Sequence, residues 1–211
     1  MSTITTDHRS VRSGVFDPHT ITAATFEPRI IADPAALGLG AFDLTPFVLN
    51  LANSGIVGGT GTAVLAIALF DGGIAQLGIG MWEFVKANTF GATAFTSRGA
   101  FWPAIERPLS NPEVEKAAGA GGVGAFLLAL TTFTALRTVA SKKTNAVLFA
   151  TLVAVTMTFV ALTIGAFTGV VGITRLGGWL GLVAAGLASY GSFAVVTNAT
   201  WKRGLPVWPS A

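Results

Sequence analysis

Residues 145–170 read NAVLFATLVAVTMTFVALTIGAFTGV, a stretch of 26 residues without a charged side chain. A helix that crosses the hydrocarbon core of a bilayer needs about 20 apolar residues, so this stretch is long enough to span a membrane. Its apolar residues form a continuous run and do not alternate with polar ones, which disfavours a transmembrane β-strand. The stretch therefore predicts a transmembrane α-helix.

The remainder of the chain repeats this pattern between short polar breaks. Five further apolar segments are long enough to be spans, at residues 36–57, 62–84, 90–106, 119–137 and 176–199. Segment 90–106 is the least apolar of them, because it contains Arg98 and ends at a polar turn. We predict an all-α integral membrane protein with six transmembrane helices within residues 33–200. A mobile tail is expected at residues 1–32, which lack the pattern of a signal peptide, and a second tail at residues 201–211.

Composition excludes several classes of protein. Charged residues make up 11% of the 211 residues, against about 25% in soluble domains, and mean hydropathy is +0.67. These values exclude an ordinary soluble enzyme and a protein that binds nucleic acid through its phosphates. The chain has no cysteine, and its two histidines, His8 and His19, lie in the predicted tail. We therefore expect no metal site, no cofactor and no nucleophile–base pair inside the membrane.

The distribution of Lys and Arg predicts the orientation. Nine of the 13 lie in the two tails and in the loops after the second and fourth predicted spans, and three lie on the opposite side. Basic residues are enriched in cytoplasmic loops. Both termini are therefore expected in the cytoplasm, with the protein in the plasma membrane.

Four ionisable residues lie inside predicted spans: Asp43, Asp71, Glu83 and Arg98. A charge at the centre of a bilayer costs roughly 2.5–3.5 kcal/mol on insertion scales, so such groups face a protein interior or a wet pathway. Two interpretations stay open at this point. Arg98 and an aspartate form an ion pair that holds helices together, or the charged groups line a path for a solute. Glu83 lies at the end of its span, where an interfacial position also explains it.

The first predicted span also carries neutral polar residues. Asn50, Asn53 and Ser54 share one helical face with Pro46, because residues three and four apart are neighbours on a helix. Phe42 lies two turns before Asn50, near that same face. Such a polar stripe packs against a neighbouring helix or lines a pore. A pore that alternates apolar and polar groups suits a small amphiphilic solute such as a short carboxylic acid.

Three stretches together resemble the acetate uptake transporter family, the group of the bacterial succinate–acetate permease. They are DPAALGL at residues 33–39, GGIAQ at residues 72–76 and NTFGATAFTS at residues 88–97. The first corresponds to the family signature, whose positions here are Asp33, Pro34, Leu37, Gly38 and Leu39. The resemblance covers about residues 33–200.

This resemblance implies a six-helix protomer, a hexameric ring of protomers and a separate pathway through each protomer. The implied substrates are acetate and, in some members, succinate, and both proton-coupled and channel-like modes are described. The narrowest point of the family's pathway corresponds to Phe42, Arg98 and Val155, where the family has phenylalanine, tyrosine and leucine. The pathway is expected to be lined by further polar or charged residues, namely Asp43, Thr45, Asn50, Asn53, Asp71, Gln76, Glu83, Thr93 and Ser97.

The sequence thus predicts a membrane transporter or channel for acetate and similar small carboxylates, without covalent chemistry. Phe42 and Val155 would form an apolar gate, and Arg98 would contact the carboxylate. Arginine at the position of the family's tyrosine is the main departure, and Asp43 stands where the permease has glycine. We hypothesise a buried Arg98–Asp43 ion pair beside Phe42. The alternative function is a non-conducting membrane scaffold or sensor, with the same fold and a pore that this pair blocks.

Overall fold

The computed structural model describes residues 31–58 and 61–208, and this part of the chain consists of helices joined by short turns and followed by a non-helical segment at residues 202–208. Its helices are α1 (Ala35–Asn53), α2 (Gly61–Ile67), the π-helix η2 (Ala68–Ala75), α3 (Gln76–Val85), α4 (Thr89–Ser110), α5 (Pro112–Ala140), the short 3-10 helix η3 (Ser141–Lys143), α6 (Ala146–Thr168) and α7 (Val171–Trp201). No strand is present within these residues, so the predicted all-α class is confirmed. The predicted tail at residues 1–32 lies outside the described part, apart from its last two residues.

Helices α2, η2 and α3 follow one another without a break, so the elements correspond to the six predicted spans. Within the described residues, five segments are long and apolar enough to cross a membrane: Ala35–Asn53, Val64–Val85, Lys116–Lys143, Ala146–Thr168 and Val171–Trp201. The sixth, α4, is 22 residues long but less apolar, since it carries Arg98 and a polar C-terminal turn. Helix α5 begins seven residues before its predicted start and bends at Gly119, whose φ is 60°.

Local sequence signals set the helix ends. The side chains of Asn88, Asn111 and Asn145 accept hydrogen bonds from backbone N–H groups in the first turns of α4, α5 and α6. Asparagine is among the preferred residues at this position, because its oxygen satisfies an N–H that has no partner inside the helix. Helix α6 ends at Thr168 and is followed by Gly169, which adopts the left-handed conformation with a φ of 69°, as glycine commonly does there.

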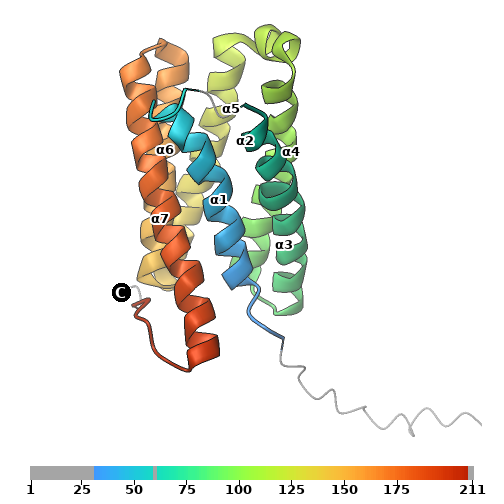
Figure 1. Ribbon diagram of the computed structural model, residues 1–211, viewed down its shortest axis with the longest axis vertical. Coiled ribbons are helices and arrows are strands. Elements are labelled where there is room, and N and C mark those ends of the chain that lie inside the picture. The colour runs from blue at the N-terminus through green and yellow to red at the C-terminus, as the bar shows by residue number, and fades with distance from the viewer. Residues whose placement is uncertain (1–30, 59–60, 209–211) are drawn as a thin grey trace, which may run out of the picture. The chain divides into compact units, whose positions relative to one another are not determined.

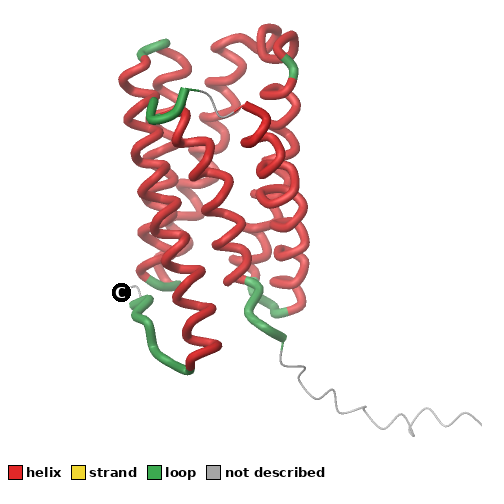
Figure 2. The backbone as a smooth tube through the Cα atoms, viewed as in Figure 1, coloured by secondary structure: helices red, strands yellow, loops and turns green. Residues whose placement is uncertain are grey.

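The helices run up and down in alternation (Figures 1 and 2). Helix α7 packs against α1 and α6, α6 packs against α5, and α4 packs against η2 and α3, which in turn contact α1. The start of α1, the α3–α4 and α5–α6 turns and the end of α7 therefore lie at one end of the bundle, which we call the terminal end. The other end is called the opposite end.

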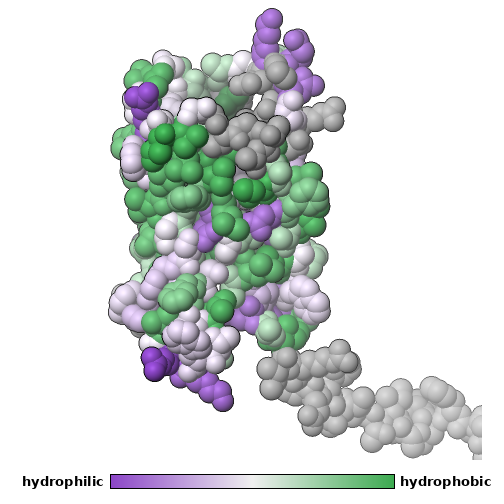
Figure 3. Space-filling model, viewed as in Figure 1, coloured by the Kyte–Doolittle hydropathy of each residue, from purple (hydrophilic) through white to green (hydrophobic). Residues whose placement is uncertain are grey.

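The outward faces of the helices are apolar. Large hydrophobic side chains such as Leu44, Phe70, Met157 and Val183 are exposed on different helices, and Figure 3 shows a hydrophobic middle with hydrophilic residues gathered towards the ends. Exposed tryptophans lie near the terminal end at positions 82, 201 and 208, and a further one, Trp179, lies nearer the start of α7. Tryptophan is enriched where a membrane meets water, so this surface has the character of one that contacts lipid.

The segment after α7 folds back onto the terminal end. The carbonyl of Trp208 accepts a 2.7 Å hydrogen bond from the N–H of Ala146, the first residue of α6. The side chain of Asn198 accepts from the N–H of Leu205 at 2.6 Å and donates to its carbonyl at 3.1 Å. These contacts tie residues 202–208 to α6 and α7.

Candidate functional site

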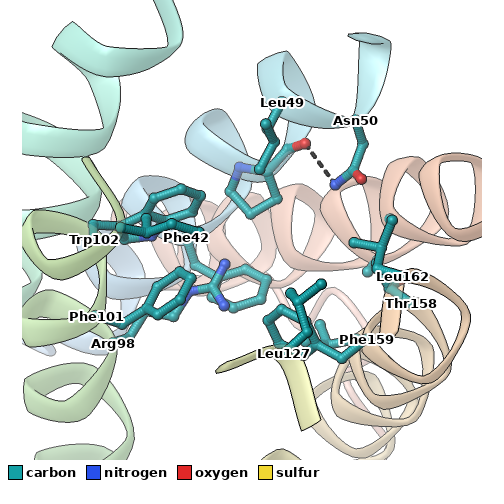
Figure 4. Close-up of a pocket in the computed structure, with 15 residues that line it drawn as sticks. Phe42, Leu49, Asn50, Arg98, Phe101, Trp102, Leu127, Thr158, Phe159 and Leu162 are labelled. Carbon is teal, nitrogen blue, oxygen red and sulfur yellow. Dashed lines mark hydrogen bonds between the residues drawn. The ribbon is translucent and has the colours of Figure 1, made fainter. Parts of the chain in front are cut away.

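Two cavities meet in the middle of the bundle. The wide cavity, of about 480 Å³, extends towards the terminal end, and the narrow cavity, of about 60 Å³, extends towards the opposite end. Both are lined by the same five residues, which we call the neck: Phe42, Arg98, Phe101, Val155 and Phe159. Figure 4 shows the neck with the residues around the narrow cavity. A neck between two cavities is the geometry of a constricted path.

Three helices supply the neck. Phe42 comes from α1, Arg98 and Phe101 come from α4, and Val155 and Phe159 come from α6. Phe42, Val155 and Phe159 pack into one buried cluster with Ala184 and Ala188 of α7. The small alanine side chains let α7 support this cluster from behind without filling the cavities. The structure thus brings together Phe42, Arg98 and Val155, the three residues expected at the narrowest point.

The guanidinium of Arg98 lies among aromatic rings. Its central carbon is 4.2 Å from the centroid of the Phe42 ring, 5.3 Å from that of Trp102 and 5.7 Å from that of Phe101. A cation over an aromatic face gains about 2 kcal/mol or more when both are desolvated. The rings therefore fix the position of the charge in the neck, as Figure 4 illustrates.

Arg98 has no acidic partner among the residues that the structure describes. The ion pair that the structure records between described side chains joins Lys86 and Asp33, at 2.9 Å, and Nε of Arg98 is buried without a hydrogen bond to any of them. The expected Arg98–Asp43 pair is therefore not formed. Successive residues on a helix point about 100° apart. Because Phe42 faces the neck, the next residue turns away from it, and Asp43 lies beside Ser189 of α7.

A buried cation without a counter-charge is costly, and aromatic faces offset only part of that cost. The guanidinium also carries five N–H donors in a planar fork that matches a carboxylate. Chemically, the neck is a place where a small anion would replace the missing counter-charge.

The two aspartates of the predicted spans lie outside the walls of both cavities. Asp43 is 9% exposed. Asp71, on the π-helix η2, lies within electrostatic reach of Asp43, and one of its oxygens is buried without a hydrogen bond to any described residue. Figure 3 shows hydrophilic atoms within the hydrophobic middle of the face that α1 and η2 form.

Glu83 and Gln76 join helices to one another. Both side chains are 0% exposed, so Glu83 does not occupy a wet interfacial position. A carboxylate oxygen of Glu83 accepts a 2.8 Å hydrogen bond from Asn88, the residue that caps α4. Gln76 donates to the carbonyl of Gly38 at 3.2 Å, which fastens α3 to α1.

The polar residues of α1 differ in their surroundings. Asn50 lines the narrow cavity, donates to the carbonyl of Pro46 at 2.8 Å and accepts from Asn53 at 3.2 Å. Thr45 is fully buried, and its hydroxyl has no partner within the described residues. Neither Thr45 nor Asn53 lines either of the two cavities.

On α4, Thr93 and Ser97 each donate to the backbone carbonyl one turn earlier, those of Thr89 and Thr93. Ser97 lines the wide cavity, whereas Thr93 is not among its walls. Both hydroxyls thus donate hydrogen bonds within α4. Of the two residues, only Ser97 is placed to contact a solute in the wide cavity.

The signature residues surround the start of α1. Asp33 and Leu39 line the wide cavity, and Asp33 accepts from the N–H of Ala35 at 3.1 Å. Pro34 immediately precedes the helix. Gly38 faces the ring of Phe95, and a Cβ atom added to Gly38 would lie 2.5 Å from Cζ of that ring. The side chain of Leu37 is 60% exposed.

Sequence reasoning missed many of the wall residues, among them Phe101, Trp102, Phe159 and Arg137. Helical spacing from a predicted residue could have found three of them, since Phe159 is four residues after Val155 on α6. Phe101 and Trp102 are three and four residues after Arg98, on the same helical face. Arg137, counted only as a loop charge for the orientation, is seven residues after Leu130, which also lines the wide cavity.

The family model described as GPR1/FUN34/yaaH family matches residues 13–203. The chain is similar to the "Succinate-acetate/proton symporter SatP" of Escherichia coli, with 37% identity over 82% of this chain and 93% of that protein. It is also similar to the "Ammonia transport outward protein 2" of Saccharomyces cerevisiae, with 40% identity over 79% of this chain. The match spans only 62% of the length of that yeast relative.

A solved structure agrees with these matches. The structure titled "Structure of the bacterial acetate channel SatP" superposes with a TM-score of 0.80 and 36% identity, and the match covers 84% of this chain and 99% of the solved one. The two proteins are thus similar both in the arrangement of their helices and in their amino-acid sequences.

Proposed function

The chain belongs to the GPR1/FUN34/yaaH family, and on that premise we propose that it carries acetate and similar small carboxylates across a membrane, as a transporter or channel. Membership confirms the family resemblance found in the sequence. The chain is a multi-pass integral membrane protein and belongs with transporters and channels, not with enzymes. The named substrates of the Escherichia coli relative support the choice of acetate and succinate as substrates.

The observation that carries the proposal is the position of Arg98. Its guanidinium lies in the neck between two cavities, held by aromatic rings and without a carboxylate partner among the described residues. Basic side chains in a constriction select anions. A carboxylate that enters the neck would accept two parallel hydrogen bonds from the guanidinium, the geometry that arginine offers to carboxylates.

In this proposal, the other neck residues contribute shape. Phe42 and Val155 form an apolar gate that fits the methyl end of acetate while Arg98 holds its carboxylate. Asn50 in the narrow cavity offers the amide N–H that Pro46 does not use, and Ser97 in the wide cavity would offer its hydroxyl by turning it from the carbonyl of Thr93 to the solute. Permeation then alternates between hydrogen bonding in the cavities and close contact in the neck.

Orientation and assembly are also part of the proposal. Basic residues at the terminal end include Lys86, Arg137, Lys142, Lys143, Lys202 and Arg203, and basic residues favour the cytoplasmic side. We therefore place the terminal end and the wide cavity on the cytoplasmic side of the plasma membrane. The hexameric ring that the family resemblance implies is proposed for this chain as well.

The name of the yeast relative raises ammonia as another solute. A fixed guanidinium in the neck would repel ammonium, since like charges in a partly desolvated site interact strongly. The charge of the neck therefore favours anions over cations.

Uptake of labelled acetate into liposomes that contain the purified full-length protein tests the proposal. The informative variant is Arg98→Tyr, which restores the residue that the resembling family carries. We expect uptake above that of empty liposomes for the unmodified protein. For the variant we expect flux at high acetate and a KM raised about tenfold, because a hydrogen bond to a charged group contributes about 1.5–3 kcal/mol.

Arg175→Gln is the matched control, because Arg175 lies outside the walls of both cavities. Its KM for acetate should match that of the unmodified protein. An unmodified protein without acetate flux, together with a gain of flux in Arg98→Tyr, would contradict the proposal. That result would point to a sensor or scaffold in which Arg98 itself closes the neck.

A further inference from the structure

A second arginine lines the wide cavity. Arg137 of α5 contributes to its wall together with Leu130, Phe133 and Thr134 of the same helix. These four residues have the spacing of a single helical face. The guanidinium carbon of Arg137 lies 4.7 Å from the centroid of the Phe133 ring. Arg137 is thus held over an aromatic ring in the same manner as Arg98.

Arg137 also resembles Arg98 in lacking an acidic partner. Its Nε is buried without a hydrogen bond among the residues that the structure describes, and no ion pair there includes it. The one acidic residue in the wall of the wide cavity is Asp33, whose carboxylate is engaged by Lys86 at 2.9 Å. The cavity therefore contains two guanidinium groups whose charge no wall residue neutralises.

The two guanidinium groups lie at different depths. Arg98 is stacked on Phe42 in the neck, and Leu130 of α5 packs against the buried cluster that contains Phe42. Arg137 follows Leu130 by seven residues, which corresponds to about 10 Å along the helix at a rise of about 1.5 Å per residue. Arg98 thus marks the inner end of the wide cavity, and Arg137 lies nearer the terminal end.

From this arrangement, we propose that Arg137 forms a second carboxylate-binding site, so that the wide cavity binds two carboxylate groups at once, one at each arginine. This proposal rests on the proposed function and deepens it. The two carboxylates come either from the two ends of one short dicarboxylate or from two monocarboxylate anions in single file. Both sources share the chemistry that the two guanidinium groups recognise.

The size of the cavity agrees with double occupancy. Its volume of about 480 Å³ compares with about 30 Å³ for one water molecule in the liquid, and acetate has only four non-hydrogen atoms. The cavity therefore has room for two acetate ions or one short dicarboxylate, with water around them. Thr134, buried in the cavity wall three residues before Arg137 on the same helical face, offers a hydroxyl group beside the proposed Arg137 site.

Isothermal titration calorimetry on the purified full-length protein, with sodium acetate and sodium succinate as probes, tests this proposal. The variants are Arg137→Gln, which removes the charge, and Arg137→Lys, which keeps it. Arg175→Gln is the matched control, an arginine outside the cavity walls. We expect two acetate ions per protomer in the unmodified protein and in the control, and one in Arg137→Gln.

Succinate affinity should fall at least tenfold in Arg137→Gln, and Arg137→Lys should recover part of that loss, because a lysine supplies charge without the fork of donors. A competition arm distinguishes the two sources. Displacement of two acetate ions by one succinate indicates a dicarboxylate that bridges both arginines, and displacement of one acetate indicates separate anions.

Unchanged acetate stoichiometry and unchanged succinate affinity in Arg137→Gln would overturn the second site. Acetate uptake into liposomes would then still stand, so the failure would concern this proposal alone. An unmodified protein that neither binds nor carries acetate would instead overturn the proposed function together with the second site.

Discussion

The guanidinium carbon of Arg98 lies 4.2 Å from the centroid of the Phe42 ring. The contact joins α4 to α1 across the neck, so one aromatic ring both lines the neck and contacts the charge within it. The family that the sequence resembles has tyrosine at the position of Arg98. By the family resemblance, phenylalanine is therefore kept at position 42 in the neck, while arginine, a fixed cation, replaces tyrosine at position 98.

The stacking of Arg98 on Phe42 should be measurable as a coupling energy. In a double-mutant cycle with Phe42→Leu and Arg98→Met, we expect a coupling of about 1–2 kcal/mol, the range of a desolvated cation–π contact. The measurement is the free energy of reversible unfolding of the purified protein in mixed micelles. Additive effects, within about 0.5 kcal/mol, would show that the ring does not hold the charge.

Asp43 and Arg98 should act independently of each other. Because the structure forms no ion pair between them, Asp43→Asn and Arg98→Met should change unfolding free energy additively, with a coupling below about 0.5 kcal/mol. Breaking a buried ion pair by removing one partner costs about 3–5 kcal/mol. A coupling of that size between the two substitutions would restore the pair that the sequence suggested.

Two glycines of α3 should respond in opposite ways to alanine. A Cβ atom at Gly80 would meet the hydroxyl of Thr96 and lie 2.8 Å from its backbone nitrogen, whereas none of the described atoms lies within 4 Å of a Cβ at Gly78. We expect Gly80→Ala to lower the free energy of unfolding by about 1–3 kcal/mol, because the added methyl group would overpack the contact between α3 and α4. Gly78→Ala, the control on the same helix, should be neutral or stabilising, because alanine favours a helix over glycine. Equal effects at both sites would mean that α3 and α4 are less closely packed than the structure shows.

Two asparagine caps should differ in their contributions to stability. Asn145→Ala should cost about 1 kcal/mol, the usual loss of an N-cap on α6. Asn88→Ala removes the cap of α4 and also leaves the buried Glu83 carboxylate without its 2.8 Å donor, which adds about 1–3 kcal/mol. Unfolding of the two variants in parallel checks the difference, and the prediction fails if Asn88→Ala is no worse than Asn145→Ala.

The fold prediction rested mainly on the lengths of the apolar segments. A run of uncharged residues such as 145–170 can only be a spanning helix once it lies in lipid, so the helices followed from composition and periodicity. Their exact ends did not, because asparagine caps and a bend at Gly119 decide them locally. The π-helix η2 was not predicted, since its apolar sequence fits an ordinary α-helix equally well.

The site was predictable only in part. Phe42, Arg98 and Val155 could be brought together through the family resemblance. The prediction of an Arg98–Asp43 ion pair was wrong. It assumed that Asp43, because it follows Phe42 in the sequence, also lies near Arg98 in space. One helical step turns Asp43 towards Ser189 instead. Arg137 was not predicted as a site residue because it lies at the end of its predicted span, where a charged residue is normally part of a loop. Only the packing of the neighbouring helices shows that it lines a cavity.

The π-helix η2 also determines where the second span can lose a residue. Each residue advances an α-helix by about 100°, and a π-helix accommodates an added residue without ending the helix. Deleting one residue between Ala68 and Ala75 should let the segment relax to α-helix while α3 keeps its orientation, because a π-helix turns less per residue than an α-helix and already absorbs one extra residue. Gln76 would then still reach Gly38, and Glu83 would still reach Asn88. The same deletion within α3 would instead rotate the residues after it by about 100°, so η2 is the place in the second span where the loss of one residue should be tolerated.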